Sequence, residues 1–167
     1  GQKNIEITIK DGKHEGERTW WYENGKKKEE SNWKNGLPDG KMILYLDTGQ
    51  KEETIFINGK EDGKSILWWD WEGQKKNRIG FFENGERTGT WTYWYQNGQK
   101  YREGTFKNGK KVGKWRVWYE NGQKIYETTY KNGEYDGLFT VWYSNGQKEE
   151  EGTYKDGGKD GLITNWY

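Results

Sequence analysis

The chain has 167 residues, of which 29% are apolar, 33% are charged and 17% are aromatic, and its formal net charge is +1. Disordered chains are similarly polar, but they do not carry 12 Trp and 12 Tyr. The near-neutral net charge excludes the strongly basic character that is typical of nucleic-acid-binding proteins. The lack of cysteine excludes disulfides and thiolate metal sites. No apolar run is long enough to insert into a membrane. The composition indicates an ordered protein that buries a few large rings rather than a thick core.

A unit of about 24 residues repeats along the whole chain. Gly-Gln-Lys, or Gly-Lys-Lys at Gly25, begins each unit. The seven copies cover residues 1–24, 25–48, 49–72, 73–97, 98–121, 122–145 and 146–167. We therefore interpret residues 1–167 as a single repeat array.

Each copy contains two turn signals, as at Asn121-Gly122 and Asn132-Gly133. Asn-Gly tolerates positive φ at both central positions, which a type I′ hairpin turn requires. The segments between turns have the length and the Trp, Tyr, Thr, Val and Ile content of strands. The pattern predicts an all-β protein, an extended twisted antiparallel meander of about seven stacked β-hairpin repeats in a solenoid-type array.

Two copies depart from the common length. The first strand of copy three, residues 51–57, is one residue short, and that of copy four, residues 75–83, is one residue long. A one-residue change moves every following side chain to the other face unless a bulge absorbs it. We therefore predict a bulge or a local change of twist near residues 78–82.

Alternation along the strands predicts two different faces. Trp115 and Val117 share one face, which we expect to pair with the face of Tyr126 and Tyr130 and to be mainly apolar. Small residues on this face would leave room for neighbouring rings, at Gly104, Thr128 and Gly152.

The opposite face is predicted to be polar, with one column of glutamates and one of lysines. The glutamates are Glu6, Glu30, Glu103, Glu127 and Glu151, and the lysines are Lys10, Lys34, Lys107, Lys131 and Lys155. The simplest interpretation is a solvated face with weak ion pairs, and the alternative is a charged docking strip.

A line of rings runs through these columns and is the candidate binding surface: Trp21, Tyr45, Trp68, Trp94, Trp118, Trp142 and Trp166. The rings either stiffen the sheet by packing on one another or serve as stacking platforms for a protein partner, a glycan or a second sheet.

The segment Glu103-Gly104-Thr105-Phe106-Lys107-Asn108-Gly109-Lys110, followed by Trp115, Trp118-Tyr119 and Asn121-Gly122-Gln123-Lys124, resembles the MORN repeat. It is most similar to the bacterial variant of YwqK-type antitoxin proteins. The resemblance implies an elongated sheet of stacked hairpins that makes protein–protein contacts rather than catalysing a reaction. It also implies two further expectations, an antitoxin-like role that neutralises a toxin partner and a bacterial source. We favour an extracellular or cell-surface location over a cytoplasmic one.

Residues for catalysis are scarce. His14 is the one histidine, so neither a Cys–His nor a Ser–His–Asp set can be assembled without it. Adjacent carboxylates such as Glu149 and Glu150 point to opposite faces of a strand. The Asp-Gly sites recur with the repeat, so turn geometry explains them. We expect no enzymatic activity, no metal site and no cofactor.

The chain begins and ends within the repeat pattern, without a distinct capping copy. Uncapped edge strands favour pairing with another chain. The candidate assembly residues are Lys3, Ile5, Ile7 and Ile9 at one end and Leu162, Ile163, Trp166 and Tyr167 at the other. The chain is expected either to be a fragment of a longer array or to pair head to tail with itself in a filament. The leading hypothesis is thus a scaffold for protein contact or self-assembly, with glycan or cell-wall binding as the alternative.

Overall fold

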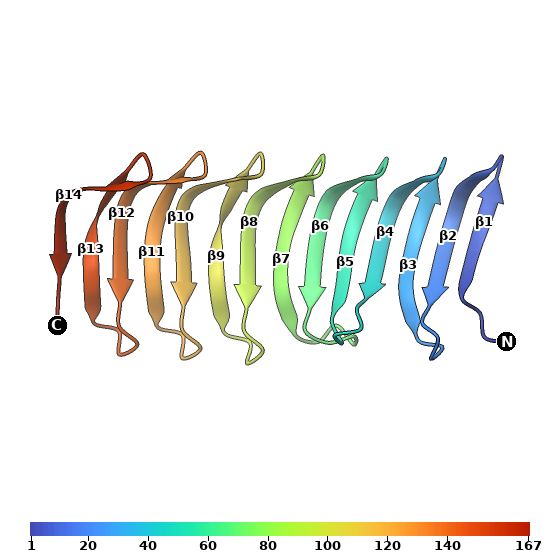
Figure 1. Ribbon diagram of the computed structural model, residues 1–167, viewed down its shortest axis with the longest axis horizontal. Helices are drawn as coiled ribbons and strands as arrows, with labels where there is room; N and C mark the ends of the chain where they lie inside the picture. Colours follow the sequence, from blue (N-terminus) through green and yellow to red (C-terminus); the bar gives the residue numbers. More distant parts are fainter. The chain divides into compact units, whose positions relative to one another are not determined.

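The computed structural model describes residues 1–167, and all its regular elements are strands (Figure 1). The chain divides into two compact units, Gly1–Glu86 and Arg87–Tyr167. The first contains β1 (Ile5–Lys10), β2 (Lys13–Trp21), β3 (Lys27–Lys34), β4 (Leu37–Tyr45), β5 (Lys51–Ile57), β6 (Lys60–Trp68) and β7 (Lys76–Glu83). The second contains β8 (Glu86–Trp94), which begins at the boundary, β9 (Lys100–Lys107), β10 (Lys110–Trp118), β11 (Lys124–Lys131), β12 (Glu134–Trp142), β13 (Lys148–Lys155) and β14 (Gly158–Asn165).

Within each unit, every strand pairs antiparallel with the next strand along the chain. Each sequence copy supplies two strands, so the predicted all-β array of hairpin repeats is confirmed. No helix covers the sheet of either unit, and the structure contains no candidate for a membrane-spanning helix.

The turn in the middle of each copy has the predicted type I′ conformation. Asn132 and Gly133 both have positive φ, at 53° and 96°. The equivalent Asn or Asp is left-handed in every copy, with φ between 49° and 53°. Asparagine and aspartate tolerate this region better than other residues with a side chain. This explains why the position before the glycine is restricted to these two residue types.

The variant Asn132→Ala is expected to destabilise the protein by about 1 kcal/mol, because alanine tolerates the left-handed region poorly. Asn132→Gly should change the free energy of unfolding by only a few tenths of that ~1 kcal/mol, because glycine adopts positive φ freely. Urea unfolding followed by tryptophan fluorescence measures both variants. Equal stabilities of the two variants would show that the conformation of this turn is not the constraint.

The turn between copies is not of type I′, which corrects the prediction. Asn121 does not have a positive φ. In this turn only Gly122 is left-handed, with a φ of 83°. The Tyr119 N–H donates to the Gln123 carbonyl at 2.8 Å, and the Gly122 N–H donates to the Tyr119 carbonyl at 2.9 Å. This is a three-residue loop, a type I turn closed by a left-handed glycine. Asn121 Oδ1 accepts the Gln123 N–H at 3.0 Å, so this asparagine is explained by its side chain.

A one-residue bulge joins each hairpin to the next in every described pair except β4–β5. The extra residues are Lys28, Asn77, Tyr101, Ile125 and Glu149. Copy three is short because β5 lacks this bulge residue. The bulge predicted near residues 78–82 lies at Asn77, directly before them, and Arg78 to Phe82 themselves pair regularly with β6. The length of copy four is absorbed before β7, where the Trp69 N–H donates to the Lys75 carbonyl at 2.7 Å across a longer loop.

The core lies on one side of the sheet, which we call the packed face. In the second unit it carries Trp115, Tyr130, Phe106 and Phe139, all buried. Trp115 is 1% exposed and meets Phe106 edge-on at 5.0 Å between ring centroids. The predicted small residues lie here: a Cβ at Gly104 would be 2.0 Å from the Trp115 ring, and one at Gly152 would be 3.0 Å from the Phe139 ring. Thr128 is 2% exposed.

Candidate functional site

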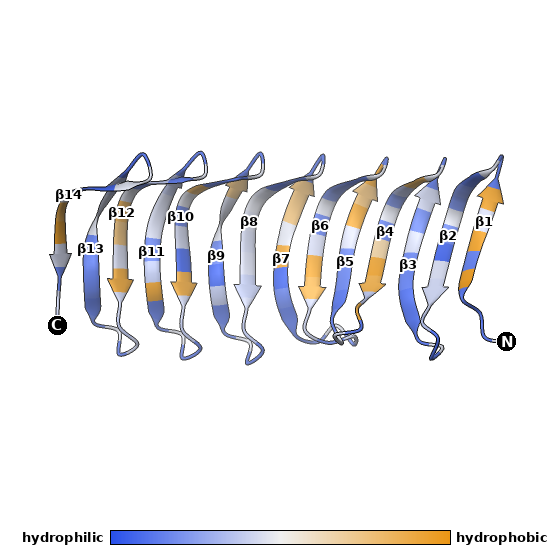
Figure 2. Ribbon diagram, viewed as in Figure 1, coloured by the Kyte–Doolittle hydropathy of each residue, from blue (hydrophilic) through white to orange (hydrophobic).

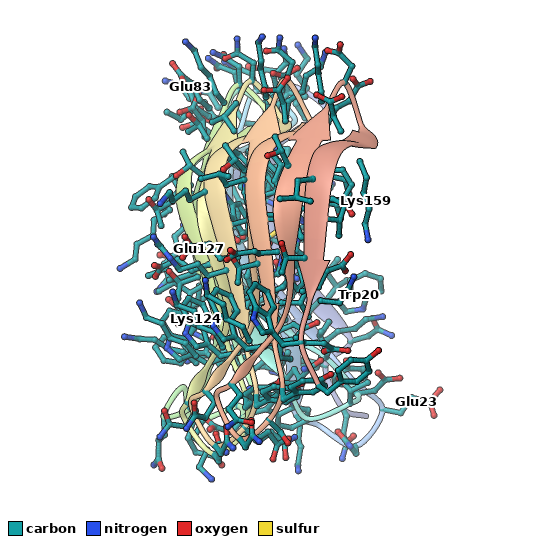
Figure 3. All side chains as sticks on the ribbon, turned by 90° about the vertical axis from the view of Figure 1, so that its left-hand side faces the viewer. Trp20, Glu23, Glu83, Lys124, Glu127 and Lys159 are labelled. Carbon is teal, nitrogen blue, oxygen red and sulfur yellow. The ribbon has the colours of Figure 1, made fainter.

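The other side of the sheet, the charged face, carries a row in which lysine and tryptophan alternate. Lys124 Nζ lies 5.0 Å from the centroid of the Trp142 ring, and Lys148 Nζ lies 5.4 Å from that of Trp166. Lys124 Nζ also pairs with Glu127 at 3.1 Å. Figure 3 shows Lys124 and Glu127 on the same side of the sheet and Lys159 on the opposite side.

The predicted glutamate column takes its partners from the Gly-Gln-Lys lysines, three residues earlier. The pairs are Lys3–Glu6, Lys27–Glu30, Lys100–Glu103, Lys124–Glu127 and Lys148–Glu151. Residues three apart on a regular strand face opposite ways, but a bulge residue between them returns both to one face. In copy three, which has no bulge, the pair is Lys51–Glu53, two residues apart. Because copy three lacks both the bulge and one residue, Lys51 and Glu53 still lie on the same face, and the ion pair is kept.

Glu127 is the most strongly perturbed carboxylate of this row. Burial raises its pKa, but hydrogen bonds from Arg116 and Lys124 outweigh burial and lower the pKa from 4.5 to about 2. The Arg116 Nε donates to Glu127 Oε2 at 2.8 Å. The ionised form is thus the one that the fold stabilises.

A folded-state pKa below the unfolded value means that Glu127 contributes stability above about pH 4.5 and loses it as the pH falls toward 2. We expect Glu127→Gln to lower the free energy of unfolding by roughly 1–2 kcal/mol at pH 7, allowing for screening. The deficit should shrink to a small fraction of that value as the pH falls to 2. Urea unfolding of both proteins between pH 2 and 7 measures this, and a deficit independent of pH would contradict it.

The predicted ring line lies on the charged face, but its rings are half-buried rather than free. Trp21, Tyr45, Trp68, Trp94, Trp118 and Trp142 are of intermediate exposure, and Trp166 is 37% exposed. Lysines lie within 6.0 Å of the Trp68, Trp118, Trp142 and Trp166 centroids. Tyr45 donates to Glu30 Oε1 at 2.8 Å, and burial together with Glu30 raises the pKa of Tyr45 to about 12. A sugar stacking on this line would have to displace lysine, and its use as a binding surface stays a prediction.

An apolar patch interrupts the charged face in the first unit, and sequence reasoning missed it. We define the isoleucine patch as Ile55, Ile57, Ile66, Ile79 and Phe81, on β5, β6 and β7, where Figure 2 shows orange segments. Ile66 pairs with Ile79, and Phe81 pairs with Lys64. Ile57 is 48% exposed and Phe81 46%, whereas Ile66 is 9% exposed. The signal was present in the sequence, because Ile57 and Ile79 stand where other copies have lysine and glutamate.

Buried charges lie within the packed face, a second feature that alternation alone did not predict. The Arg18 and Glu29 side chains are 15% and 9% exposed and form an ion pair. Ser31 donates to the same Glu29 oxygen at 2.5 Å, and Trp33 Nε1 donates to Ser31 Oγ at 2.8 Å. The Arg18 guanidinium also lies 4.3 Å from the centroid of the Trp33 ring. This network fixes the side chains of the packed face in the first unit.

The candidate assembly residues lie on β1 and β14 and beside them. Ile5 and Ile9 are 47% and 51% exposed, Leu162 is 85% exposed and Ile163 is half-buried. Lys3 forms an exposed ion pair with Glu6, Ile7 pairs with Arg18, and Tyr167 is fully exposed. Head-to-tail pairing through these strands stays a prediction.

The single histidine and the acidic residues form no candidate metal site. His14 lies edge-on to the Trp33 ring, at 5.0 Å, and no group of three or more acidic or histidine side chains is placed to hold a metal ion.

Comparison with known proteins agrees with the repeat geometry. The MORN repeat variant family matches residues 15–35, 87–108, 111–132 and 135–156, which together cover just over half of the chain. No curated protein matches. Among solved structures, the crystal structure of TarM is similar at 12% identity with a TM-score of 0.34, over 56% of this chain and 18% of that one. Since each family match begins in the even strand of one hairpin and ends in or near the next hairpin's odd strand, the sequence family and the structural repeat coincide. The chain belongs to the MORN repeat variant family.

Proposed function

We propose that the protein is a non-catalytic scaffold that binds a partner protein through the isoleucine patch. The observation that carries this proposal is the exposure of Ile57 and Phe81 together on a face that in the first unit otherwise carries mainly charged residues and half-buried rings. Contiguous exposed apolar surface with a polar rim is typical of protein interaction sites. The repeat architecture supports it, because a stack of similar hairpins presents a broad, rigid surface.

The charges around the patch favour a partner with acidic residues around its apolar contact. Lys60 pairs with Ile57 and Lys64 with Phe81, both lysines are exposed, and neither forms an ion pair. Glu53, beside the patch, is already paired with Lys41 and Lys51. A second copy docked patch to patch would bring the free lysines against their counterparts, at a cost in repulsion. We therefore infer a different protein rather than a second copy.

The test is capture of the partner by the tagged chain from a lysate of the source organism, then identification, purification and calorimetric titration. Ile57→Glu combined with Phe81→Glu should weaken binding of that purified partner at least about 100-fold, because both apolar contacts are lost and acidic repulsion is added.

The matched control is Leu138→Glu combined with Leu162→Glu, which places the same charges at leucines that are 73% and 85% exposed. This control should bind within about threefold of the original chain. Circular dichroism verifies that both variants are folded. Equal affinity of the patch variant and the original chain would overturn the proposal, as would loss of binding in the control alone.

A further inference from the structure

A pocket opens on the packed face of the second unit, and its walls are mostly aromatic. It has a volume of about 210 Å³ and is lined by Tyr126, Thr128, Tyr135, Phe139, Val141, Glu150 and Tyr154. The Tyr135 and Tyr154 rings stack at 4.9 Å between centroids, and Phe139 lies 4.7 Å from Tyr154. Several ring faces and one carboxylate thus converge on one space.

Neighbouring copies show what this position of the repeat normally holds. Two residues after the mid-copy turn glycine, Arg87 lies 4.6 Å from the Trp91 centroid, and Lys111 lies 4.7 Å from that of Tyr130. Copy seven has Lys159 at this position, 5.3 Å from the Phe139 centroid. In copy six the residue is Tyr135, which is neutral. The cations of copies five and seven thus lie over two rings of copy six, Tyr130 and Phe139, whereas position 135 contributes a neutral ring to the pocket.

Thr128 provides an independent observation. Its side chain lines the pocket and is 2% exposed, yet its Oγ1 makes no hydrogen bond within the protein. A buried hydroxyl without a partner is costly and uncommon. A ligand with a hydroxyl or another polar group beside its cation would satisfy it.

We propose that this pocket binds a quaternary ammonium group carried by a small hydroxylated molecule, of which choline is the simplest. Ring faces attract such cations, and a trimethylammonium group needs no hydrogen bonds. A primary ammonium would need hydrogen-bond acceptors, and Glu150 Oε1 is already taken by Lys159. Glu150 also lines the pocket, where it shares its negative charge with Lys159. This site is independent of the isoleucine patch, so either proposal can fail alone.

Choline added to the full chain and followed by NMR titration should give saturable shifts of the pocket residues. The neutral isostere 3,3-dimethylbutan-1-ol has the same shape without the charge and should bind at least about tenfold more weakly, because the rings attract the cation. Equal affinity for the two compounds, or no saturable binding of choline, would overturn the proposal.

Three variants sharpen this experiment. Tyr135→Lys supplies the cation that copies five and seven already have, and should weaken choline binding at least about tenfold with the fold retained. Glu150→Gln should weaken it several-fold, whereas Lys159→Met should strengthen it, because it removes a competing ammonium from Glu150. Leu138→Lys, on the exposed charged face of the same strand as Tyr135, is the control and should leave affinity unchanged. Unchanged binding in both Tyr135→Lys and Glu150→Gln would contradict the site.

Discussion

Replacing Gly104 by alanine is expected to destabilise the second unit by about 3 kcal/mol, although it adds only one methyl group. The new Cβ would lie 2.0 Å, 2.3 Å and 2.6 Å from three atoms of the Trp115 ring. Trp115 cannot move aside easily, because it is 1% exposed and packs between Phe106 and Tyr130. Guanidinium unfolding followed by tryptophan fluorescence measures the loss.

The control for this variant is Gly158→Ala, in the same unit. Gly158 does not have a positive φ, and the nearest atom to its added Cβ is the Lys155 carbonyl oxygen at 3.8 Å. Its stability should change by no more than ~0.5 kcal/mol. A second check is Trp115→Leu in the Gly104→Ala background, where the added methyl should cost much less than it does under the indole. If Gly104→Ala were as stable as Gly158→Ala, the close packing of this glycine against Trp115 would be refuted.

The second large effect is expected for Arg18→Met, at about 3 kcal/mol. The change leaves the Glu29 carboxylate, 9% exposed, without its cationic partner. Ser31 still donates to Glu29, but one neutral hydroxyl does not replace a guanidinium that also lies over the Trp33 ring. The free energy of unfolding in urea, measured for the full chain, gives the loss.

The double variant Arg18→Met with Glu29→Met should recover at least half of that loss, because no buried charge then remains unpaired. Lys3→Met breaks an ion pair of the same unit whose side chains are 69% and 62% exposed, and it should cost less than ~0.5 kcal/mol. A double variant as unstable as the single one would show that the destabilisation comes from lost packing and not from the stranded carboxylate.

The repeat period and the turn glycines predicted the strands, their order and the type I′ turns, because these depend on local backbone preferences. Alternation likewise placed Gly104 beneath a ring of the neighbouring strand. The turn at Asn121-Gly122 was assigned wrongly because the same dipeptide fits two turns, and only the loop length set by Tyr119 and Gln123 distinguishes them. Dipeptide identity is a weaker signal than the closing hydrogen bonds.

The bulges explain most of what alternation missed. A bulge residue such as Ile125 brings Lys124 and Glu127 to one face, so strict period-two counting assigns the wrong partner to the glutamate. The Arg18–Glu29 pair was missed for another reason. Counting along each strand marks Glu29 as polar. It does not reveal that Arg18, which pairs with Ser31, reaches Glu29 diagonally across the two strands and allows its burial.

The common pattern of the seven copies does not reveal the isoleucine patch, because the patch consists of departures from that pattern. Copies three and four interrupt both charged columns, with Ile57 in a lysine slot and Ile79 in a glutamate slot. In a repeat protein, such departures carry more information about binding than the consensus does, because the consensus is required for stacking alone.

The most direct measurement of the central proposal is hydroxyl-radical footprinting of the chain alone and with its purified partner. Ile57 and Phe81, 48% and 46% exposed in the free chain, should lose most of their oxidation when the partner is bound. Leu162, which is 85% exposed, should be oxidised equally in both states. Unchanged oxidation of Ile57 and Phe81 in the saturated complex would contradict docking on the isoleucine patch.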